Sequence, residues 1–301
     1  MENSIYRKFR ERLIVHGLDQ YEADAELRLI FEEFTSVDPV KNPSGISDGA
    51  FESDKGREQL EKIEAAIERL LSGEPVDYII GKKWFYGLEF KVSPAVLVPR
   101  NDTELLCEEL IKRADSMQKE KSTKIRIFDL CTGSGCIIIS AAVMLSGKCE
   151  KAGLDAGECF SFTASDISDP ALRIAKLNAK RHNVSVEFLS GDMFGALDED
   201  SRFDIIVSNP PYIPAGEKSV LDRKVAEHEP EIALFGGKDG LDFYRDIAKN
   251  AKNYLNPGGM LMLEIGYDQG ESVPKLLKAE GYEDITVKKD YAGLDRMVIC
   301  T

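Results

Sequence analysis

Long apolar runs, paired cysteines and histidines are all scarce in this 301-residue sequence. No apolar stretch reaches the roughly 18 residues that a membrane-spanning helix needs, and the charged, amphipathic N-terminus does not resemble a secretory signal. The six cysteines include no CxxC pair, and the three histidines are not spaced as metal ligands. These absences predict a cytoplasmic protein with free thiols and no metal site.

Positive charge is also in short supply. The chain carries 39 Lys and Arg against 53 Asp and Glu, a net charge of −14. Such a chain repels phosphate backbones, so we expect no nonspecific nucleic-acid binding, although the composition still allows a local basic patch. Apolar residues make up 43% of the chain, which is typical of a globular protein rather than a disordered one. At roughly 150 residues per domain, the length predicts about two domains.

The N-terminal part of the chain has the apolar spacing of helices. Apolar side chains recur every three or four residues in segments 5–13 and 23–34, and again in 54–71. Ser53 is placed to cap the third of these helices. We therefore expect residues 1–80 to form a small helical domain. It serves either as a docking surface for a macromolecule or as a packing support, and periodicity does not choose between them.

The pattern changes after the helical part. Residues 84–92, WFYGLEFKV, are aromatic and β-branched around Gly87, which predicts a β-hairpin in a linker over 81–100. In residues 101–301, strand-like runs such as IRIFDL alternate with helical patterns such as CIIISAAVML. That alternation is typical of βαβ units around a parallel sheet buried on both faces. Two runs near the C-terminus, DITVKKDY and DRMVIC, are expected to be antiparallel neighbours.

A glycine-containing turn follows the first strand of this pattern. Asp129 lies in that strand, and Thr132, Gly133 and Gly135 precede the next helix. Glycines there let backbone N–H groups approach a ligand at the carboxyl edge of the sheet, although an ordinary strand-to-helix turn looks similar. The dinucleotide fingerprint GxGxxG is incomplete because Ile138 occupies its third glycine position. A nucleoside without a pyrophosphate is therefore favoured over NAD.

Acidic residues also follow the second and third strands. Asp166 ends the second strand, where a carboxylate can accept hydrogen bonds from both hydroxyls of a ribose. It could equally cap the next helix, although Asp169, directly before a proline, already fits that position. Asp192 and Met193 follow the third strand. A carboxylate beside an apolar side chain there can hold an adenine ring.

The decisive motif is Asn209-Pro210-Pro211-Tyr212, directly after the apolar strand FDIIV. Its prolines remove two N–H donors and fix the backbone. The Asn209 side-chain oxygen and the Pro210 carbonyl then offer two fixed acceptors for the two hydrogens of a planar NH2 group, and Tyr212 supplies an aromatic wall. Holding both N–H bonds orients the nitrogen lone pair and supports the charge that develops as it attacks. A proline-stiffened turn is the alternative, which we disfavour because the tetrapeptide is rare and ends a strand.

Four other features have competing interpretations. Cys131 and Cys136 are candidate nucleophiles, but packing is favoured because no histidine is near in sequence. His228 is either a base or a lid contact, and we favour the contact. Residues 213–238 are expected to form a loop that closes over substrate, with a disordered connector as the alternative. Residues 147–158 are expected to form a surface loop.

The glycine turn, the acidic strand end and the NPPY tetrad together resemble a seven-stranded methyltransferase that uses S-adenosylmethionine and acts on a planar amino nitrogen. Segments 75–106, 229–247, 258–270 and 289–298 narrow the resemblance to the peptide-chain release factor glutamine N5-methyltransferase (HemK/PrmC) family, over essentially the whole chain. The implied fold is α/β, a class I (Rossmann-like) methyltransferase domain over 101–301 preceded by the helical domain and the hairpin linker.

This resemblance implies an enzyme that methylates the side-chain amide of the glutamine in a release factor's Gly-Gly-Gln loop. The N-terminal helices and the hairpin would engage the release factor, with no direct nucleic-acid or membrane binding. The implied catalytic and substrate-binding residues are Asn209, Pro210, Pro211 and Tyr212. The implied contacts to S-adenosylmethionine are Asp129, Thr132, Gly133, Gly135, Asp166, Asp192, Met193 and Asn209.

Three positions depart from the family pattern, and two other functions share parts of it. Cys131 replaces a glycine, Asn101 a proline and His228 an aromatic residue. An amino methyltransferase acting on a nucleic-acid base carries the same tetrad, but the acidic chain and the absence of an aromatic, basic surface in the N-terminal module count against it. A non-catalytic release-factor adaptor is the other alternative, and the intact tetrad counts against it.

Overall fold

The computed structural model describes residues 4–121 and 123–301. The chain divides into two compact units, Met1–Lys82 with Asp222–His228 (unit 1) and Lys83–Leu221 with Glu229–Thr301 (unit 2). Among the described residues, no helix combines the length and the apolar character that crossing a membrane requires.

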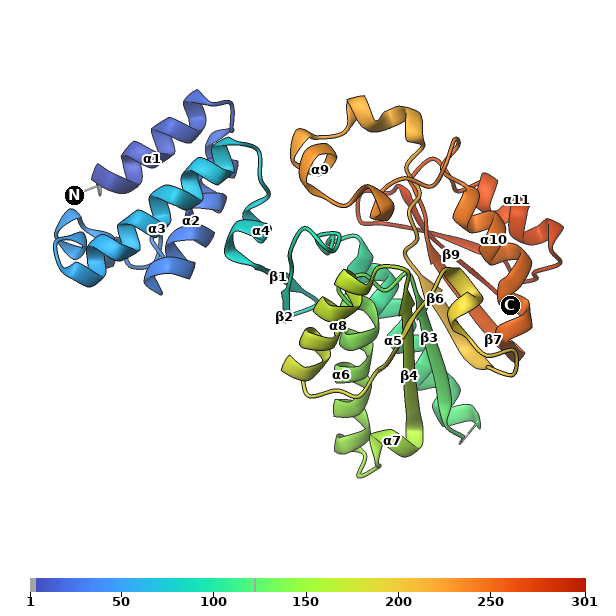
Figure 1. Cartoon of the computed structure of the whole chain (residues 1–301). Coiled ribbons are helices and arrows are strands. Elements are labelled where there is room, and N and C mark those ends of the chain that lie inside the picture. The colour runs from blue at the N-terminus through green and yellow to red at the C-terminus, as the bar shows by residue number, and fades with distance from the viewer. Residues whose placement is uncertain (1–3, 122) are drawn as a thin grey trace. The chain divides into compact units, whose positions relative to one another are not determined.

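Unit 1 is helical, and its three main helices confirm those expected from the apolar spacing (Figure 1). The Ser53 side chain accepts a hydrogen bond from the backbone N–H of Gly56, so the expected cap is present. The core of the unit includes Leu13, Phe31 and Ile67. The helices are α1 Ser4–Val15, α2 Gln20–Thr35, α3 Asp54–Leu71, α4 Val76–Ile80 and α9 Arg223–His228, with 3₁₀ turns η1 Pro43–Ile46 and η2 Asp48–Phe51.

Helix α9 comes from far along the chain but belongs to unit 1. Its Lys224 Nζ lies 2.6 Å from a carboxylate oxygen of Glu22 and 2.7 Å from one of Glu26, both on α2. The loop expected over 213–238 is thus largely ordered, because η4 Ala215–Val220, α9 and η5 Glu231–Ala233 all lie within it. Closure of this segment over a substrate stays a prediction.

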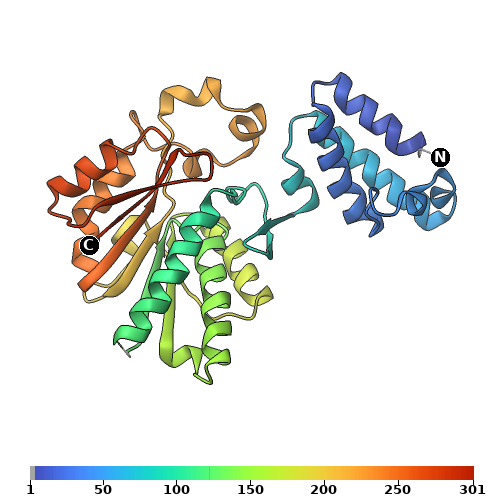
Figure 2. The ribbon, with the colours of Figure 1, turned by 180° about the vertical axis from the view of Figure 1, so that it is seen from behind.

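Unit 2 is built on a seven-stranded sheet in the order β5-β4-β3-β6-β7-β9-β8 (Figures 1 and 2). Strands β3 to β7 pair in parallel, and β9 runs antiparallel to both β7 and β8. This confirms the α/β prediction and the antiparallel C-terminal pair. The strands are β3 Ile125–Leu130, β4 Phe160–Asp166, β5 Glu187–Ser190, β6 Phe203–Ser208, β7 Leu255–Glu264, β8 Thr286–Lys289 and β9 Asp295–Cys300.

Alternate residues of the central strands enter two cores, one on each face of the sheet. On β6, Ile205 and Val207 join a core with α5, α6 and α8, whereas Ile206 joins a core with α10 and α11. Burial on both faces explains why these strands are continuously apolar. The helices of the unit are α5 Thr103–Lys121, α6 Cys136–Lys151, α7 Ala156–Cys159, α8 Asp169–Arg181, α10 Asp242–Asn250 and α11 Ser272–Ala279, with 3₁₀ turns η3 Met193–Ala196 and η6 Ala251–Tyr254.

The expected hairpin is present as β1 Lys82–Phe85 and β2 Leu88–Lys91. Its two turn residues, Tyr86 and Gly87, have φ of 51° and 74°. Positive φ at both central positions fits a type I′ turn, whose twist matches that of paired strands.

Two local predictions are wrong. The loop expected over residues 147–158 is confined to 152–155, because α6 continues to Lys151 and α7 begins at Ala156, and Cys149 is buried. The polar residues there made this stretch look like a loop, but they are the exposed face of a helix end. Asp169 is not the cap of α8 either. The Ser168 hydroxyl accepts the capping bond from Ala171, and Asp169 instead accepts a hydrogen bond from the Ser190 hydroxyl at 2.7 Å.

Candidate active site

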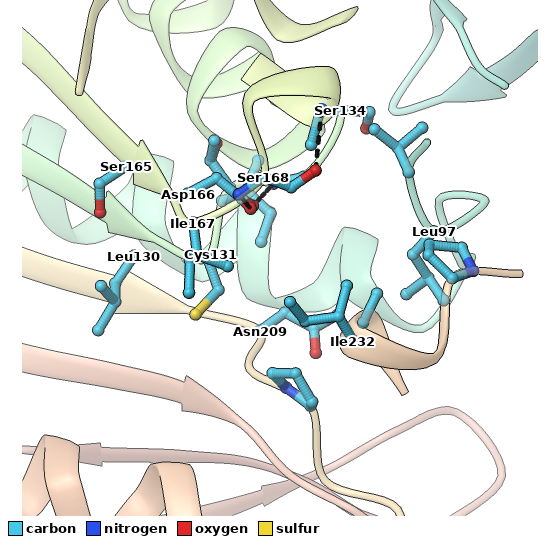
Figure 3. Close-up of a pocket in the computed structure, with 18 of the residues that line it drawn as sticks. Leu97, Leu130, Cys131, Ser134, Ser165, Asp166, Ile167, Ser168, Asn209 and Ile232 are labelled. Carbon is cyan, nitrogen blue, oxygen red and sulfur yellow. Dashed lines mark hydrogen bonds between the residues drawn. The ribbon is translucent and has the colours of Figure 1, made fainter. Parts of the chain in front are cut away.

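A pocket lies in unit 2 at the carboxyl ends of β3, β4 and β6 (Figure 3). The sheet order reverses between β3 and β6, because the chain continues to β4 and β5 on one side and to β7 on the other. Ligands of open α/β sheets bind at such a reversal. The predicted site residues that line the pocket are Thr132, Gly133, Asp166, Asp192, Met193, Asn209 and Pro211.

The turn after β3 has a left-handed backbone at three positions. Cys131, Gly133 and Gly135 have φ of 61°, 56° and 79°. Cys131 thus adopts the conformation that a glycine would favour, at a conformational cost of about 1–2 kcal/mol. At Gly135, a Cβ would come within 2.6 Å of Ile139 Cδ1, so this position requires glycine. Within the turn, the N–H groups of Thr132, Gly133 and Gly135 donate to Ser165 O, Asp166 Oδ2 and Thr132 O.

Asp129 does not line the pocket but is hydrogen-bonded to the turn. It is fully buried, and its Oδ2 accepts a hydrogen bond of 2.6 Å from the Thr132 hydroxyl. Burial raises the pKa of Asp129 to about 7, against the opposing effect of that bond. The structure thus places Asp129 behind Thr132, and direct contact of Asp129 with a cofactor stays a prediction.

Asp166 lies on the pocket wall with both oxygens engaged by backbone. Oδ2 accepts from Gly133 N at 2.8 Å and Oδ1 from Ser168 N at 2.9 Å. Burial raises the pKa of Asp166, while these backbone bonds oppose the rise. Since Ser168 caps α8, Asp166 is not the cap. Each carboxylate oxygen can accept a further hydrogen bond, so two hydroxyl donors can still be bound. Figure 3 shows Asp166 and Asn209 with Cys131 between them.

The NPPY backbone is held by its neighbours, and its first two acceptors are left unused. The Tyr212 carbonyl accepts from Gln269 Nε2 at 3.1 Å, and Gly236 lies close against the Pro211 carbonyl. In residues 4–121 and 123–301, no donor hydrogen-bonds the Pro210 carbonyl or Asn209 Oδ1. The tetrad therefore has one side-chain acceptor and one backbone acceptor that receive no hydrogen bond from the described residues.

Four predicted residues, Asp129, Gly135, Pro210 and Tyr212, do not line the pocket. Pro210 is buried directly beside Asn209, and burial raises the pKa of Tyr212 to about 12, so its hydroxyl stays neutral. Their roles at the site stay predictions.

Of the other candidate catalytic residues, the two cysteines lie in the pocket lining and His228 lies outside it. Cys131 and Cys136 line the pocket, and burial raises both thiol pKa values, that of Cys136 to about 12. Neutral thiols are poor nucleophiles, which supports packing over catalysis. His228 belongs to unit 1, outside the pocket lining, and its Nε2 is buried without a hydrogen-bond partner among the described residues.

Several pocket residues had no signal in the sequence. The irregular segment 95–100 lines one wall, and its Arg100 forms a 2.5 Å ion pair with the buried Glu229. Glu229 also accepts a hydrogen bond from Val98 N at 3.3 Å. An extended apolar segment has no periodicity to reveal which side chains face a ligand. Thr103 and Phe243, at the starts of two helices, also line the pocket.

This fold and this site define the seven-stranded methyltransferase class, and comparisons with known proteins agree. The PrmC N-terminal domain family matches residues 4–81, and the Methyltransferase small domain family matches residues 101–228. The catalytic domain of hMettl16, solved with the MAT2A 3′UTR hairpin 6, has a TM-score of 0.53 at 14% identity, covering 81% of each chain. At that identity the likeness shows the fold alone.

Relatives of higher identity show the family. The release factor glutamine methyltransferase of Geobacter sulfurreducens is 39% identical over 248 residues, 82% of this chain and 80% of that protein. That of Fusobacterium nucleatum is 35% identical over 296 residues, 98% of this chain and 77% of that protein. The chain belongs to the release factor glutamine methyltransferase family.

Proposed function

We propose that this enzyme transfers a methyl group from S-adenosylmethionine to the side-chain amide nitrogen of the glutamine in a release factor's Gly-Gly-Gln loop. The observation that carries the proposal is the pair of unused acceptors, Asn209 Oδ1 and the Pro210 carbonyl, at the end of β6. A carboxamide NH2 group has two hydrogens to match them.

The pocket residues fit a nucleoside with a sulfonium group. Asp166 retains acceptor capacity for the ribose hydroxyls, and Asp192 with Met193, which also line the pocket, would hold the adenine ring. The turn from Thr132 to Gly135 would hold the remaining polar part of the molecule. When bound, S-adenosylmethionine supplies an already activated methyl group.

The protein's own contribution is alignment. A carboxamide nitrogen is a weak nucleophile because its lone pair is delocalised into the carbonyl. Acceptors at Asn209 and Pro210 orient the N–H bonds and stabilise the positive charge that appears on nitrogen during attack, so their effect is largest in the transition state. Tyr212 would support the tetrad from outside the pocket lining, and the buried surroundings would exclude water from the amide.

Residues 1–80 and the hairpin would form the surface that recognises the release factor. The exposed Trp84 on β1 supports this role, because large exposed aromatic side chains are enriched at protein interfaces. The net charge of −14 disfavours a nucleic-acid substrate, and family membership does not favour either alternative function.

The test is direct. The protein is incubated with S-adenosylmethionine and a purified release factor, and the added methyl group is located by peptide mass spectrometry. We expect one methyl group on the glutamine of the Gly-Gly-Gln peptide and none on a matched release factor whose loop glutamine is replaced by alanine. Methylation of nucleic acid in place of that peptide, or no methylation at all, would refute the proposal.

A further inference from the structure

A buried carboxyl group lies beside the amide clamp and has no role in the account so far. Glu264 ends β7 and is 1% exposed. Strands β6 and β7 are parallel neighbours with Ser208 opposite Leu263. The next residue on each strand is Asn209 on one side and Glu264 on the other, so the pairing register brings these two side chains together at the carboxyl edge.

Thr103 completes the group from the start of α5. The Asn209 Nδ2 atom donates a hydrogen bond of 3.3 Å to Thr103 Oγ1. Burial raises the pKa of Glu264 to about 7, while hydrogen bonds from Thr103 and Asn209 and the charge of Arg296 oppose the rise. Both side chains thus lie close to the Glu264 carboxyl. Its Oε2 atom is buried without a hydrogen-bond partner among the described residues.

The chemistry of these three groups fixes one orientation of the Asn209 amide. The ionised Glu264 carboxylate has acceptors only. In the neutral form, which is also populated when the pKa is about 7, the carbonyl oxygen remains an acceptor and the hydroxyl is a donor. Thr103 Oγ1 accepts the N–H of Asn209 at 3.3 Å, so in the proposed arrangement the hydroxyl proton of Thr103 points away from Asn209, toward the nearby Glu264 carboxyl. If the Asn209 amide were flipped, its oxygen would meet these acceptors and its NH2 would face the pocket. A flipped amide would present donors to the N–H groups of the substrate.

We propose that Glu264 and Thr103 are positioning residues that hold the Asn209 side-chain oxygen toward the substrate amide. The inference rests on the proposed function, since it assigns a purpose to the orientation of the clamp. Neither residue needs to touch the methyl group or the reacting nitrogen. Their effect is on the fraction of Asn209 side chains that present an acceptor, and therefore on kcat.

Two variants of Glu264 test this. Glu264→Met keeps the size of the side chain but removes every acceptor, whereas Glu264→Gln keeps a carbonyl oxygen. We expect kcat to fall about 10- to 100-fold in Glu264→Met, the scale on which misplacing a reacting group costs rate. Glu264→Gln should stay at least about fivefold above Glu264→Met. The KM for the release factor and the Kd for S-adenosylmethionine should change less than about threefold in both. Equal kcat in the two folded variants would overturn the inference.

Thr103 provides an independent pair that keeps the test decisive if Glu264→Met does not fold. Thr103→Val replaces the hydroxyl by a methyl group, and Thr103→Ser retains the hydroxyl. We expect Thr103→Val to lower kcat about 10-fold or more and Thr103→Ser to recover most of that loss. A Thr103→Ser kcat as low as that of Thr103→Val would refute the role of the hydroxyl. If the wild-type protein methylates no release factor, the proposed function fails. If the wild-type protein is active but the two variants of each pair have the same kcat, the proposed function stands and only the positioning role is refuted.

Discussion

At the residue scale, burial and nearby hydrogen-bond donors together set the pKa values of the carboxyl groups around the pocket. Asp166 is held by two backbone N–H groups, Asp129 by one hydroxyl, and Glu264 by side chains of two other elements. Burial raises the pKa of all three carboxyls, so each is sensitive to the loss of a donor.

Replacing Asp166 should weaken cofactor binding. Asp166→Ala removes the acceptors proposed for the ribose and the bonds to Gly133 and Ser168 that shape the turn. A hydrogen bond to a charged group is worth about 1.5–3 kcal/mol, so the Kd for S-adenosylmethionine, measured by calorimetry, should rise about 10- to 100-fold. Arg173→Ala on the exposed face of α8 serves as the control. Unchanged affinity in Asp166→Ala would contradict the assignment.

Glu264 also predicts a pH dependence of stability. Its pKa is about 7 in the folded protein against an ordinary value of 4.5, so the folded state binds the proton more tightly. The stabilisation from this proton is complete below about pH 4.5 and is lost as the pH rises through 7. Glu264→Gln removes this contribution. Between pH 5 and 8 the free energy of unfolding in urea should fall by roughly 3 kcal/mol more in wild type than in the variant, at about 1.4 kcal/mol per pKa unit. Parallel pH profiles would show that Glu264 does not titrate in this way.

Sequence reasoning identified Asn209 and Asp166 because each directly follows an apolar strand, so chain position alone puts them at the ligand edge of the sheet. It missed the contact of Asn209 with Thr103. That contact depends on the register of β6 against β7 and on the placement of α5, which no local pattern encodes.

At the element scale, the tetrad is held by a glycine loop. Gly240, which precedes α10, has φ of +74°, and a Cβ there would lie 2.2 Å from the Tyr212 carbonyl oxygen. Nearby, the Gln269 amide donates to both the Tyr212 and the Gly240 carbonyls, at 3.1 and 3.2 Å. The loop and the tetrad therefore fix each other's backbone.

Gly240→Ala should therefore destabilise the protein through two effects. The added Cβ strains the left-handed backbone, and it also collides with the Tyr212 carbonyl oxygen. Left-handed strain costs about 1–2 kcal/mol and overpacking about 1–3 kcal/mol, so we expect a loss of about 2–5 kcal/mol. Gly293→Ala is the matched control, since Gly293 has φ of +82° with nothing within 4 Å of a Cβ. Its cost in urea unfolding should be about 1 kcal/mol. Equal losses in the two variants would show that the tetrad tolerates displacement.

The elements themselves were largely predictable. Apolar periodicity located α1, α2 and α3 and the strands of the buried sheet, because each presents one face or both faces to a core. The predictions failed where polarity was mistaken for irregularity, as at residues 147–158, and where two adjacent residues both suit a helix cap, as at Ser168 and Asp169.

At the scale of the whole molecule, the chain leaves unit 2 after Leu221 and returns at Glu229, and the intervening α9 is part of unit 1. Sequence could not reveal this, because a six-residue helix of mostly polar residues has no distinctive pattern. The attachment rests on Lys224, whose side chain is 24% exposed between Glu22 and the mostly buried Glu26.

Lys224→Ala should therefore destabilise unit 1. The variant leaves the carboxyl of Glu26 buried without its cation. Breaking a fully buried ion pair costs about 3–5 kcal/mol, and we expect about 2 kcal/mol here because Lys224 retains some exposure. Lys275→Ala, which breaks an exposed pair with Glu271, is the control and should cost less than about 0.5 kcal/mol. A loss in Lys224→Ala no larger than the control would show that α9 is not anchored by this residue.

The most direct test of the amide clamp is the rate of methyl transfer by Asn209→Ala in a single turnover, with S-adenosylmethionine saturating and a release factor as acceptor. The clamp predicts a rate at least about 100-fold below wild type in a folded protein, since removing one preorganised hydrogen-bonding group from a reaction centre costs about 100- to 1000-fold. A rate equal to that of wild type would contradict it.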